Sequence, residues 1–426
     1  MDEGVVVRPE LVSLGVLVTA VPRDAVDNAV AARGAGDRRS GGKLPAHVTA
    51  YLTMALCMFA EDDYEEVATK VTGALTAWGC WGADWSVPTA SGITQARKRL
   101  GAKVMEEVFE RVAGPVVGIL TRGAWLRGWR LLAIDGFEVD VADTSRNAAE
   151  FGRSGSGEGA SAFPKARVVA LAECGTHALV AAAIGPMAEG EKTLAKRLYP
   201  RLRPDEPLTG DRNFYAFDAW ALAAGSGAAL LWRAPTGLGL PVVRVLPDGT
   251  YLSVLINPAI RGARRRAAIL AAACEIADGE AGTEFDPARA RARADELAAA
   301  YHQRWEEETG NDQLKTHPRG PGKILRSRLP ELVYQEIWAW LLVHHAISGL
   351  AARAAQAADL DPDQVSFTRV LRIDRRTATG TAGSPLRTGT ASRPTSWPRS
   401  PARPTRNGAT AATPASSNAP ATTATA

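Results

Sequence analysis

Cysteine is scarce in this chain of 426 residues, and the few that occur are widely separated. The four cysteines, Cys57, Cys80, Cys174 and Cys274, form no Cys-x-x-Cys pair. Their spacing argues against a disulfide framework and against a zinc site built on cysteine. It favours a protein of the reducing cytoplasm.

Long hydrophobic runs are also lacking. The longest apolar stretch, Ile337 to Ala352, contains two histidines and falls short of the ~20 residues that a membrane span needs. We therefore expect a buried helix there and no membrane partner. The acidic start Met1-Asp2-Glu3 does not resemble a signal peptide. The glycine-rich residues 152–161 lack the Gly-Lys-Ser/Thr ending of a phosphate-binding loop.

Acidic residues and lysine disappear after Asp374. The remaining residues are mainly Ala, Thr, Pro, Ser, Gly and Arg, and Trp397 is the one aromatic residue among them. Such a segment cannot bury enough apolar surface to offset its ordering entropy. We expect residues 377–426 to form a disordered low-complexity tail. The whole chain has a net charge of +4, which permits nucleic-acid binding without establishing it.

Helical spacing dominates the first part of the chain, and we expect a helical DNA-binding domain over residues 1–125. Thr89 to Leu100 reads as a helix that Gly101 ends. Its basic residues Arg97 and Arg99 lie near its end and are candidate DNA contacts. The alternative is a surface helix whose cations complement the helix dipole.

From Leu131 the pattern predicts strand, strand, strand, helix, strand, helix, strand. An apolar run over residues 131–134 ends at Asp135-Gly136, and residues 137–141 then alternate like a strand. The following elements are predicted at residues 167–172 and 177–184 (strands), 189–202 (helix), a strand ending at 208, 217–224 (helix) and 228–233 (strand). This order predicts a mixed sheet with helices on both faces, in an α/β domain over residues 126–376.

The predicted α/β domain carries an insertion at about residues 236–292. A single hairpin is clear in it, formed by residues 242–246 and 250–255 around the turn Pro247-Asp248-Gly249. We expect a shortened, β-containing insertion. A long buried helix is predicted over residues 331–357.

Four polar side chains share one stripe of a predicted helix after the insertion. At about 100° per residue, Tyr301, Arg304, Glu308 and Lys315 fall within roughly 60°. A carboxylate flanked by two cations suits a site where a metal and a phosphate backbone meet. The alternative is a solvated charged face. Asp312 faces the same way and is a rival to Glu308.

The spacing Tyr-x2-Arg-x3-Glu-x6-Lys resembles the signature of DDE transposases of the insertion-sequence-4 type. Residues 133–136 (Ala-Ile-Asp-Gly), 209–214 (Thr-Gly-Asp-Arg-Asn-Phe) and 366–369 (Ser-Phe-Thr-Arg) extend the resemblance, which covers roughly residues 5 to 376. It implies a ribonuclease-H-like catalytic core. It also implies that Asp135, Asp211 and Glu308 are catalytic and hold two Mg²⁺ (or Mn²⁺) ions.

The same resemblance implies DNA as the partner. Tyr301, Arg304 and Lys315 match residues associated with DNA-backbone contact, and Arg212 follows the second aspartate and joins them. The implied function is cleavage at the terminal inverted repeats of an insertion element and strand transfer into target DNA. A homodimer on paired DNA ends is expected. Two alternatives stay open: a metal-dependent nuclease without strand transfer, and a catalytically impaired copy that retains DNA binding only.

Overall fold

The computed structural model divides into two units, Met1–Gly383 and Ser384–Ala426, and every residue described below lies in the first. The described residues are 17–37, 44–77, 86–119, 121, 124–126, 129–155, 157–232, 242–245, 251–253 and 324–378. Among their helices, none combines the length and the hydropathy that crossing a membrane requires. The predicted Glu308 helix and residues 379–426 of the predicted tail lie outside the described residues. The tail was predicted to begin too early, because Thr377 and Ala378 belong to the last helix, Phe367–Ala378.

Helices make up the first part of the described chain, as predicted. They are α1 (Leu17–Ala20), α2 (Arg23–Ala32), α3 (Ala46–Met58), α4 (Tyr64–Ala77), α5 (Ala90–Leu100) and α6 (Ala102–Val112). The hydroxyl of Thr89 accepts a hydrogen bond from Gly92 N and so caps the start of α5. Gly101 ends α5 with a φ of +77°, a value that favours glycine.

A five-stranded mixed sheet follows, in the spatial order β5-β4-β3-β6-β7. Its strands are β3 (Leu132–Asp140), β4 (Lys165–Glu173), β5 (Leu179–Pro186), β6 (Leu208–Gly210) and β7 (Leu230–Trp232). β4 is antiparallel to both β3 and β5, whereas β3, β6 and β7 run parallel. In the chain, helix α8 (Glu191–Ala195) lies between β5 and β6, and helix α9 (Phe217–Ala224) lies between β6 and β7. The predicted order of strands and helices is therefore present.

Local details differ from the predictions for physical reasons. The apolar run ends at Asp135, but β3 continues through Asp135-Gly136 to Asp140 because β4 pairs with its whole length. The helix predicted over residues 189–202 ends at Ala195 and is followed by a 3-10 turn, Tyr199–Arg201. Pro200 has no N–H to donate and disfavours the α conformation at the residue before it.

Several short elements were not predicted. They are β1 (Trp125–Leu126) paired with β2 (Trp129–Arg130), α7 (Ser145–Phe151), and 3-10 turns at Gly157–Gly159 and Pro362–Gln364. The predicted hairpin is present as β8 (Val242–Val245) and β9 (Tyr251–Ser253).

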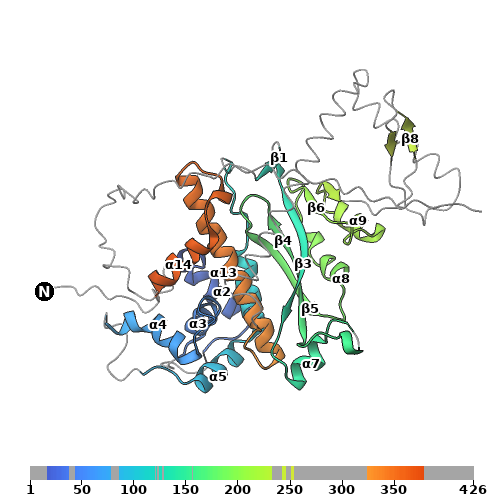
Figure 1. The fold of residues 1–426 in the computed structure, drawn as a ribbon. Coiled ribbons are helices and arrows are strands. Elements are labelled where there is room, and N and C mark those ends of the chain that lie inside the picture. The colour runs from blue at the N-terminus through green and yellow to red at the C-terminus, as the bar shows by residue number, and fades with distance from the viewer. Residues whose placement is uncertain are drawn as a thin grey trace, which may run out of the picture. The chain divides into compact units, whose positions relative to one another are not determined.

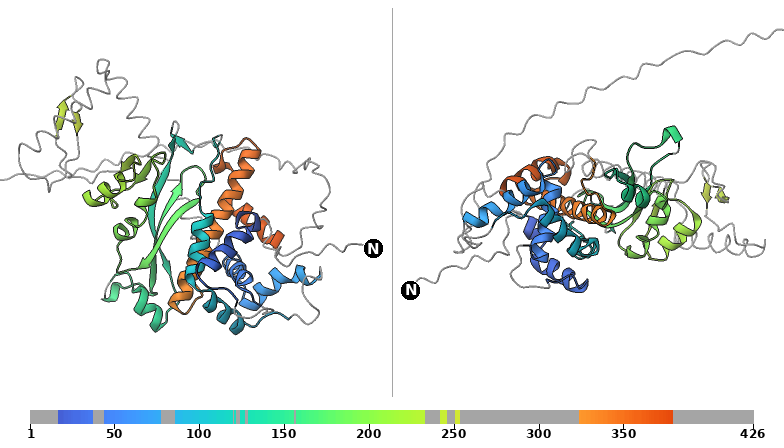
Figure 2. Two further views of the ribbon diagram at one scale, coloured as in Figure 1. Left: turned by 180° about the vertical axis from the view of Figure 1, so that it is seen from behind. Right: turned by 90° about the horizontal axis from the view of Figure 1, so that it is seen from below.

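Helix α13 (Pro330–Ala357) lies between the N-terminal helices and the sheet (Figures 1 and 2). It packs against α3 and α6 on one side and against β5 on the other. One apolar core joins α13 to these helices and to the sheet face that carries Phe137 and Val139. A second core fills the opposite face, beneath α8 and α9. α14 (Phe367–Ala378) then packs on α13.

Candidate active site

Asp135 and Asp211 come together at the centre of the sheet. β3 and β6 are parallel neighbours in which Ala133 faces Thr209 and Ile134 faces Gly210. The next residues along the two strands are Asp135 and Asp211. Since neighbouring strands lie about 4.8 Å apart, two residues at equivalent positions carry adjacent side chains. The register therefore brings the two predicted catalytic aspartates, 76 positions apart in the chain, side by side.

Both aspartates belong to the face of the sheet that is turned toward α13. Successive strand residues point to opposite faces. Ile134 packs in the core beneath α8, whereas Phe137 packs in the core that contains α13, with its ring centroid 6.2 Å from that of Trp340. Asp135 lies two residues before Phe137 and therefore points to the same face of the sheet as Phe137. Asp135 and Asp211 are each partly exposed, so solvent reaches the pair.

A glycine lies next to each aspartate, and each faces the opposite side of the sheet. A Cβ atom on Gly210 would lie 3.2 Å from the Trp232 ring and 3.3 Å from Ile134 Cγ2. A Cβ atom on Gly136 would lie 2.8 Å from Cδ and Oε1 of Glu191. The side chains of α8 and β7 therefore pack directly on the backbone that carries the aspartates. This close packing holds the two strands in register behind the site.

Glu191 brings a third carboxylate into the electrostatic surroundings of the pair. Burial raises the pKa of the Glu191 carboxyl above its usual range; Arg167 lowers it, and the charges of Asp135 and Asp211 raise it further. Arg167 donates to the carbonyls of Met187 and Glu189, at 3.3 and 3.0 Å, and so fixes the segment before α8. The excess of negative charge around the aspartates favours a cation there. No pattern in the sequence points to Glu191, because its position depends on how α8 docks on the sheet.

The loop after β6 is organised by Asp211 itself. Asp211 Oδ1 accepts a hydrogen bond from Asn213 N at 2.6 Å, so one oxygen of the carboxylate is already oriented. Arg212 follows Asp211 and is exposed, as the predicted contact with a phosphate requires. The described non-glycine residues with positive φ are His177 and Asp359, and Asn213 is not one of them. Asn213 therefore does not need the left-handed conformation in which glycine is favoured.

The donor set fits a hard divalent cation as far as the described chain extends. Carboxylate oxygens are the ligands that Mg²⁺ and Mn²⁺ prefer. Within the described ranges, no three His, Cys, Asp or Glu side chains gather closely enough to hold a metal. The predicted third ligand, Glu308, and the stripe residues Tyr301, Arg304 and Lys315 lie outside the described residues, as does Asp312.

Arg97 is not at the surface, and the expectation that it contacts DNA phosphate is wrong for this structure. The residue is 1% exposed. Its guanidinium donates to Gln335 Oε1 at 2.9 Å and to the Tyr64 hydroxyl at 2.7 Å. It also donates to Ser327 Oγ and to the Leu332 carbonyl, both at 3.2 Å. Arg97 therefore ties α5 to α4 and α13 and has no free donor direction toward solvent.

The sequence contained a signal for this burial. The buried residues of α5 are Ile93, Ala96, Arg97 and Leu100, which follow the i, i+3, i+4, i+7 spacing of a core-facing stripe. Arg97 occupies a core position in that stripe, whereas Lys98 and Arg99 point outward and are exposed. The prediction of a DNA contact on α5 therefore passes to Arg99, with Lys98 beside it.

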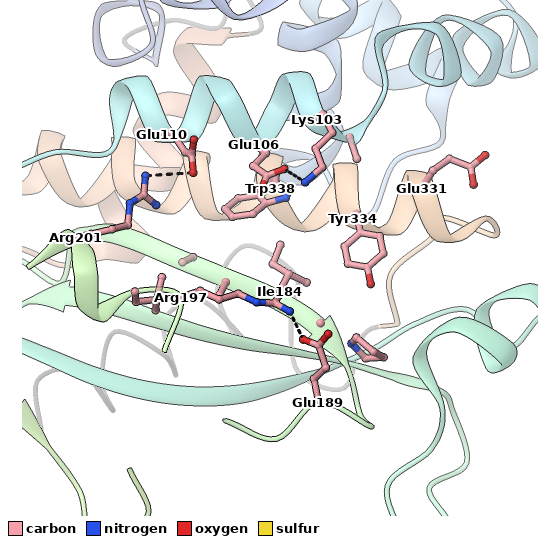
Figure 3. Close-up of a pocket in the computed structure, with 16 residues that line it drawn as sticks. Lys103, Glu106, Glu110, Ile184, Glu189, Arg197, Arg201, Glu331, Tyr334 and Trp338 are labelled. Atoms are coloured by element: carbon pink, nitrogen blue, oxygen red, sulfur yellow. Dashed lines mark hydrogen bonds and ion pairs between the residues drawn. The ribbon is translucent and has the colours of Figure 1, made fainter. Parts of the chain in front are cut away.

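The groove drawn in Figure 3 is separate from the aspartate pair. It has a volume of about 630 Å³ and lies between α6, α13 and the edge strand β5. Its charges are paired across it and along its rim: Arg201 with Glu110 at 3.2 Å, and Arg197 with Glu189 at 2.7 Å. Neither Asp135 nor Asp211 lines this groove. We assign it no part in the candidate site.

Comparisons with known proteins agree with the sequence resemblance. Residues 11–110 match the family described as insertion element 4 transposase N-terminal. The chain is 30% identical over 291 residues to transposase InsG for insertion sequence element IS4 of Escherichia coli, and the aligned part covers 65% of each chain. It is 31% identical over 154 residues to putative transposase InsZ of the same organism, covering 34% of this chain and 49% of that protein.

Among solved structures, the piggyBac transposase synaptic complex with hairpin DNA aligns with a TM-score of 0.43 and 9% identity, over 87% of this chain and 80% of that one. The chain spans 65% and 49% of the lengths of the two Escherichia coli relatives. The matched family region contains helices α1 to α5. By its sequence the chain is similar to transposases of the insertion-sequence-4 type.

Proposed function

We propose that this chain is a DNA transposase that cuts phosphodiester bonds at the terminal inverted repeats of its insertion element and transfers the freed strand to target DNA. The observation that supports this most is the register of β3 and β6, which sets Asp135 beside Asp211. The order of strands and helices around them is the one predicted for a ribonuclease-H-like core, and we propose that fold for residues 126–376.

Asp135, Asp211 and Glu308 are the residues that would hold Mg²⁺ or Mn²⁺. When bound, two such ions would supply an activated oxygen nucleophile and would stabilise the charge on the leaving oxygen. Asp135 and Asp211 contribute oxygens whose positions are fixed by the paired strands. Asn213 N donates to Oδ1 of Asp211 and so orients its carboxylate.

Basic residues around the aspartates would position the DNA backbone. Arg212 is exposed directly after Asp211, and its fork of donors suits a phosphate. We propose the same role for Tyr301, Arg304 and Lys315 on the stripe of Glu308, and for Arg99 on α5. The proposed substrates are the ends of the element and the target duplex, bound by a homodimer with paired ends.

The test is cleavage of DNA that carries the flanking ends of the element, with and without Mg²⁺. Asp135→Asn and Asp211→Asn keep the side-chain shape and remove the anion, so cleavage should be lost while DNA binding in EDTA remains. Asp143→Asn is the matched control, because Asp143 is exposed and pairs with Arg153 at 2.7 Å, away from the pair. Cleavage that survives in both aspartate variants would refute the proposed site. Cleavage without joining to target DNA would support a nuclease instead.

A further inference from the structure

Helix α14 carries a row of outward arginines that the candidate site does not use. Arg369, Arg372 and Arg376 are all exposed. At about 100° per residue they fall at roughly 0°, 300° and 340°, within a stripe about 60° wide. The stripe extends over about 10 Å of helix axis, since each residue rises about 1.5 Å.

The opposite side of α14 holds the helix in place and fixes where the row points. Its buried residues are Phe367, Leu371, Asp374 and Ala378, which centre almost diametrically opposite the arginines. Phe367 stacks on His344 of α13, with ring centroids 5.0 Å apart. The packing of this opposite side therefore turns the row of arginines toward solvent.

Arg369 and Arg372 in this row differ from the cations of α2 and α6. On α2 and α6, cations lie against carboxylates, in the pairs Arg23–Asp27 at 2.7 Å, Lys103–Glu106 at 2.6 Å and Arg111–Glu107 at 2.8 Å. Within the described chain, Arg369 and Arg372 have no carboxylate within 4.0 Å. The one acidic residue of α14, Asp374, is 1% exposed and faces the core.

A row of like charges at these spacings disfavours its own helix unless an anion neutralises it. We propose that the outer face of α14 binds the phosphate backbone of double-stranded DNA, as a surface additional to the cleavage site. Phosphates recur about every 3.4 Å of axis along one strand, so about 10 Å of helix matches roughly three of them. Arginine suits this contact because its planar fork meets phosphate oxygens in pairs. The proposal rests on the proposed action on DNA but not on the metal site.

The experiment measures the salt dependence of DNA binding by the full chain in EDTA, with a fluorescent duplex of unrelated sequence. Neutralising a phosphate contact changes the slope of log K against log salt by about 0.9. Arg369→Ala with Arg372→Ala should therefore flatten the slope by about 2. Arg369→Lys with Arg372→Lys keeps the charges and should restore most of the slope.

The matched control is Lys103→Ala with Arg111→Ala, which removes the same charge from two exposed, ion-paired sites and should leave the slope unchanged. Thermal unfolding checks that all variants are folded. Suppose that the wild-type protein binds DNA but the alanine pair on α14 changes the slope no more than the control pair does. This inference is then overturned, while the proposed function stands. If the wild-type chain does not bind DNA, both are overturned.

Discussion

Arg97 and Gln335 hydrogen-bond to each other in both directions. Arg97 Nε donates to Gln335 Oε1 at 2.9 Å, and Gln335 Nε2 donates to the Arg97 carbonyl at 2.9 Å. Gln335 is fully buried and also donates to the Gly101 carbonyl at 3.0 Å. The end of α5 is thereby joined to α13 through a closed polar network. A basic residue that resembles a DNA contact in the sequence is thus part of the core.

Replacement of Arg97 should therefore act on stability. Arg97→Ala leaves the buried amide of Gln335 and the Tyr64 hydroxyl with unsatisfied groups, and we expect a loss of about 3 kcal/mol in the free energy of unfolding. Arg99→Ala, on the exposed side of the same helix, should change it by less than about 0.5 kcal/mol. Urea unfolding of both variants measures the difference. Equal effects would show that the network contributes little.

The two glycines beside the aspartates should respond differently to a methyl group. Gly210→Ala presses on Trp232, which lies between Tyr199 and Trp220 with centroid distances of 5.6 and 5.2 Å and cannot turn away. We expect a cost of about 1–3 kcal/mol. Gly136→Ala meets only the flexible end of Glu191, so its cost should stay below about 1 kcal/mol. Chemical denaturation ranks the two variants, and the reverse order would contradict the packing described.

The buried imidazole of His345 should make stability depend on pH. Burial lowers the pKa of His345 from 6.5 to about 4, and its Nδ1 donates to the Leu179 carbonyl at 2.8 Å. Because the unfolded chain binds this proton more tightly, the contribution is fully present above pH 6.5 and is lost as the pH falls toward 4. Between pH 7 and pH 5 it should decrease by about 2 kcal/mol.

His345→Gln lacks this titration. Its free energy of unfolding should therefore fall less between pH 7 and pH 5 than that of the wild-type chain. Urea titrations at the two pH values give the comparison, and parallel losses in both proteins would assign the pH dependence to other groups.

Glu308 is distinguished from Asp312 by the spacing to its motif partners, and both face the same side of the predicted helix. Glu308→Gln should reduce Mg²⁺-dependent cleavage more than about 100-fold, beyond the range typical of residues that only support a metal ligand. DNA binding should persist, and Asp312→Asn should be much milder. A cleavage assay on both variants decides. Loss of cutting in Asp312→Asn alone would assign the third ligand to Asp312.

The sequence predicted best those helices and strands whose pattern is uninterrupted. The strand order and the bounds of α9 were predictable because each apolar run is short and ends at a turn residue. The whole helix Phe217–Ala224 agrees with its prediction. The helix from residue 189 was predicted too long because its spacing continues to Leu202, while the backbone effect of Pro200 ends it earlier.

For the candidate site, the two aspartates were predictable, but their surroundings were not. Asp135 lies in β3 and Asp211 directly follows β6, and the register between these two strands brings them together. Glu191 packs on Gly136 and Trp232 packs on Gly210 through tertiary contacts that no local pattern encodes. Arg97 shows the converse: it was predicted at the surface because of its charge, whereas its spacing from Ile93, Ala96 and Leu100 is typical of a buried position.

The position of α13 has a consequence for the order in which the protein can fold during synthesis. Helices α3 and α6 leave the ribosome early, yet the apolar surface they share is completed by residues 330–357. Domains generally fold as units while the chain emerges, N-terminal parts first. Here the N-terminal helices must wait for the sheet, the insertion and α13 to be translated. A messenger that stops before codon 330 would therefore yield helices with an exposed apolar face, a substrate for chaperones and proteases.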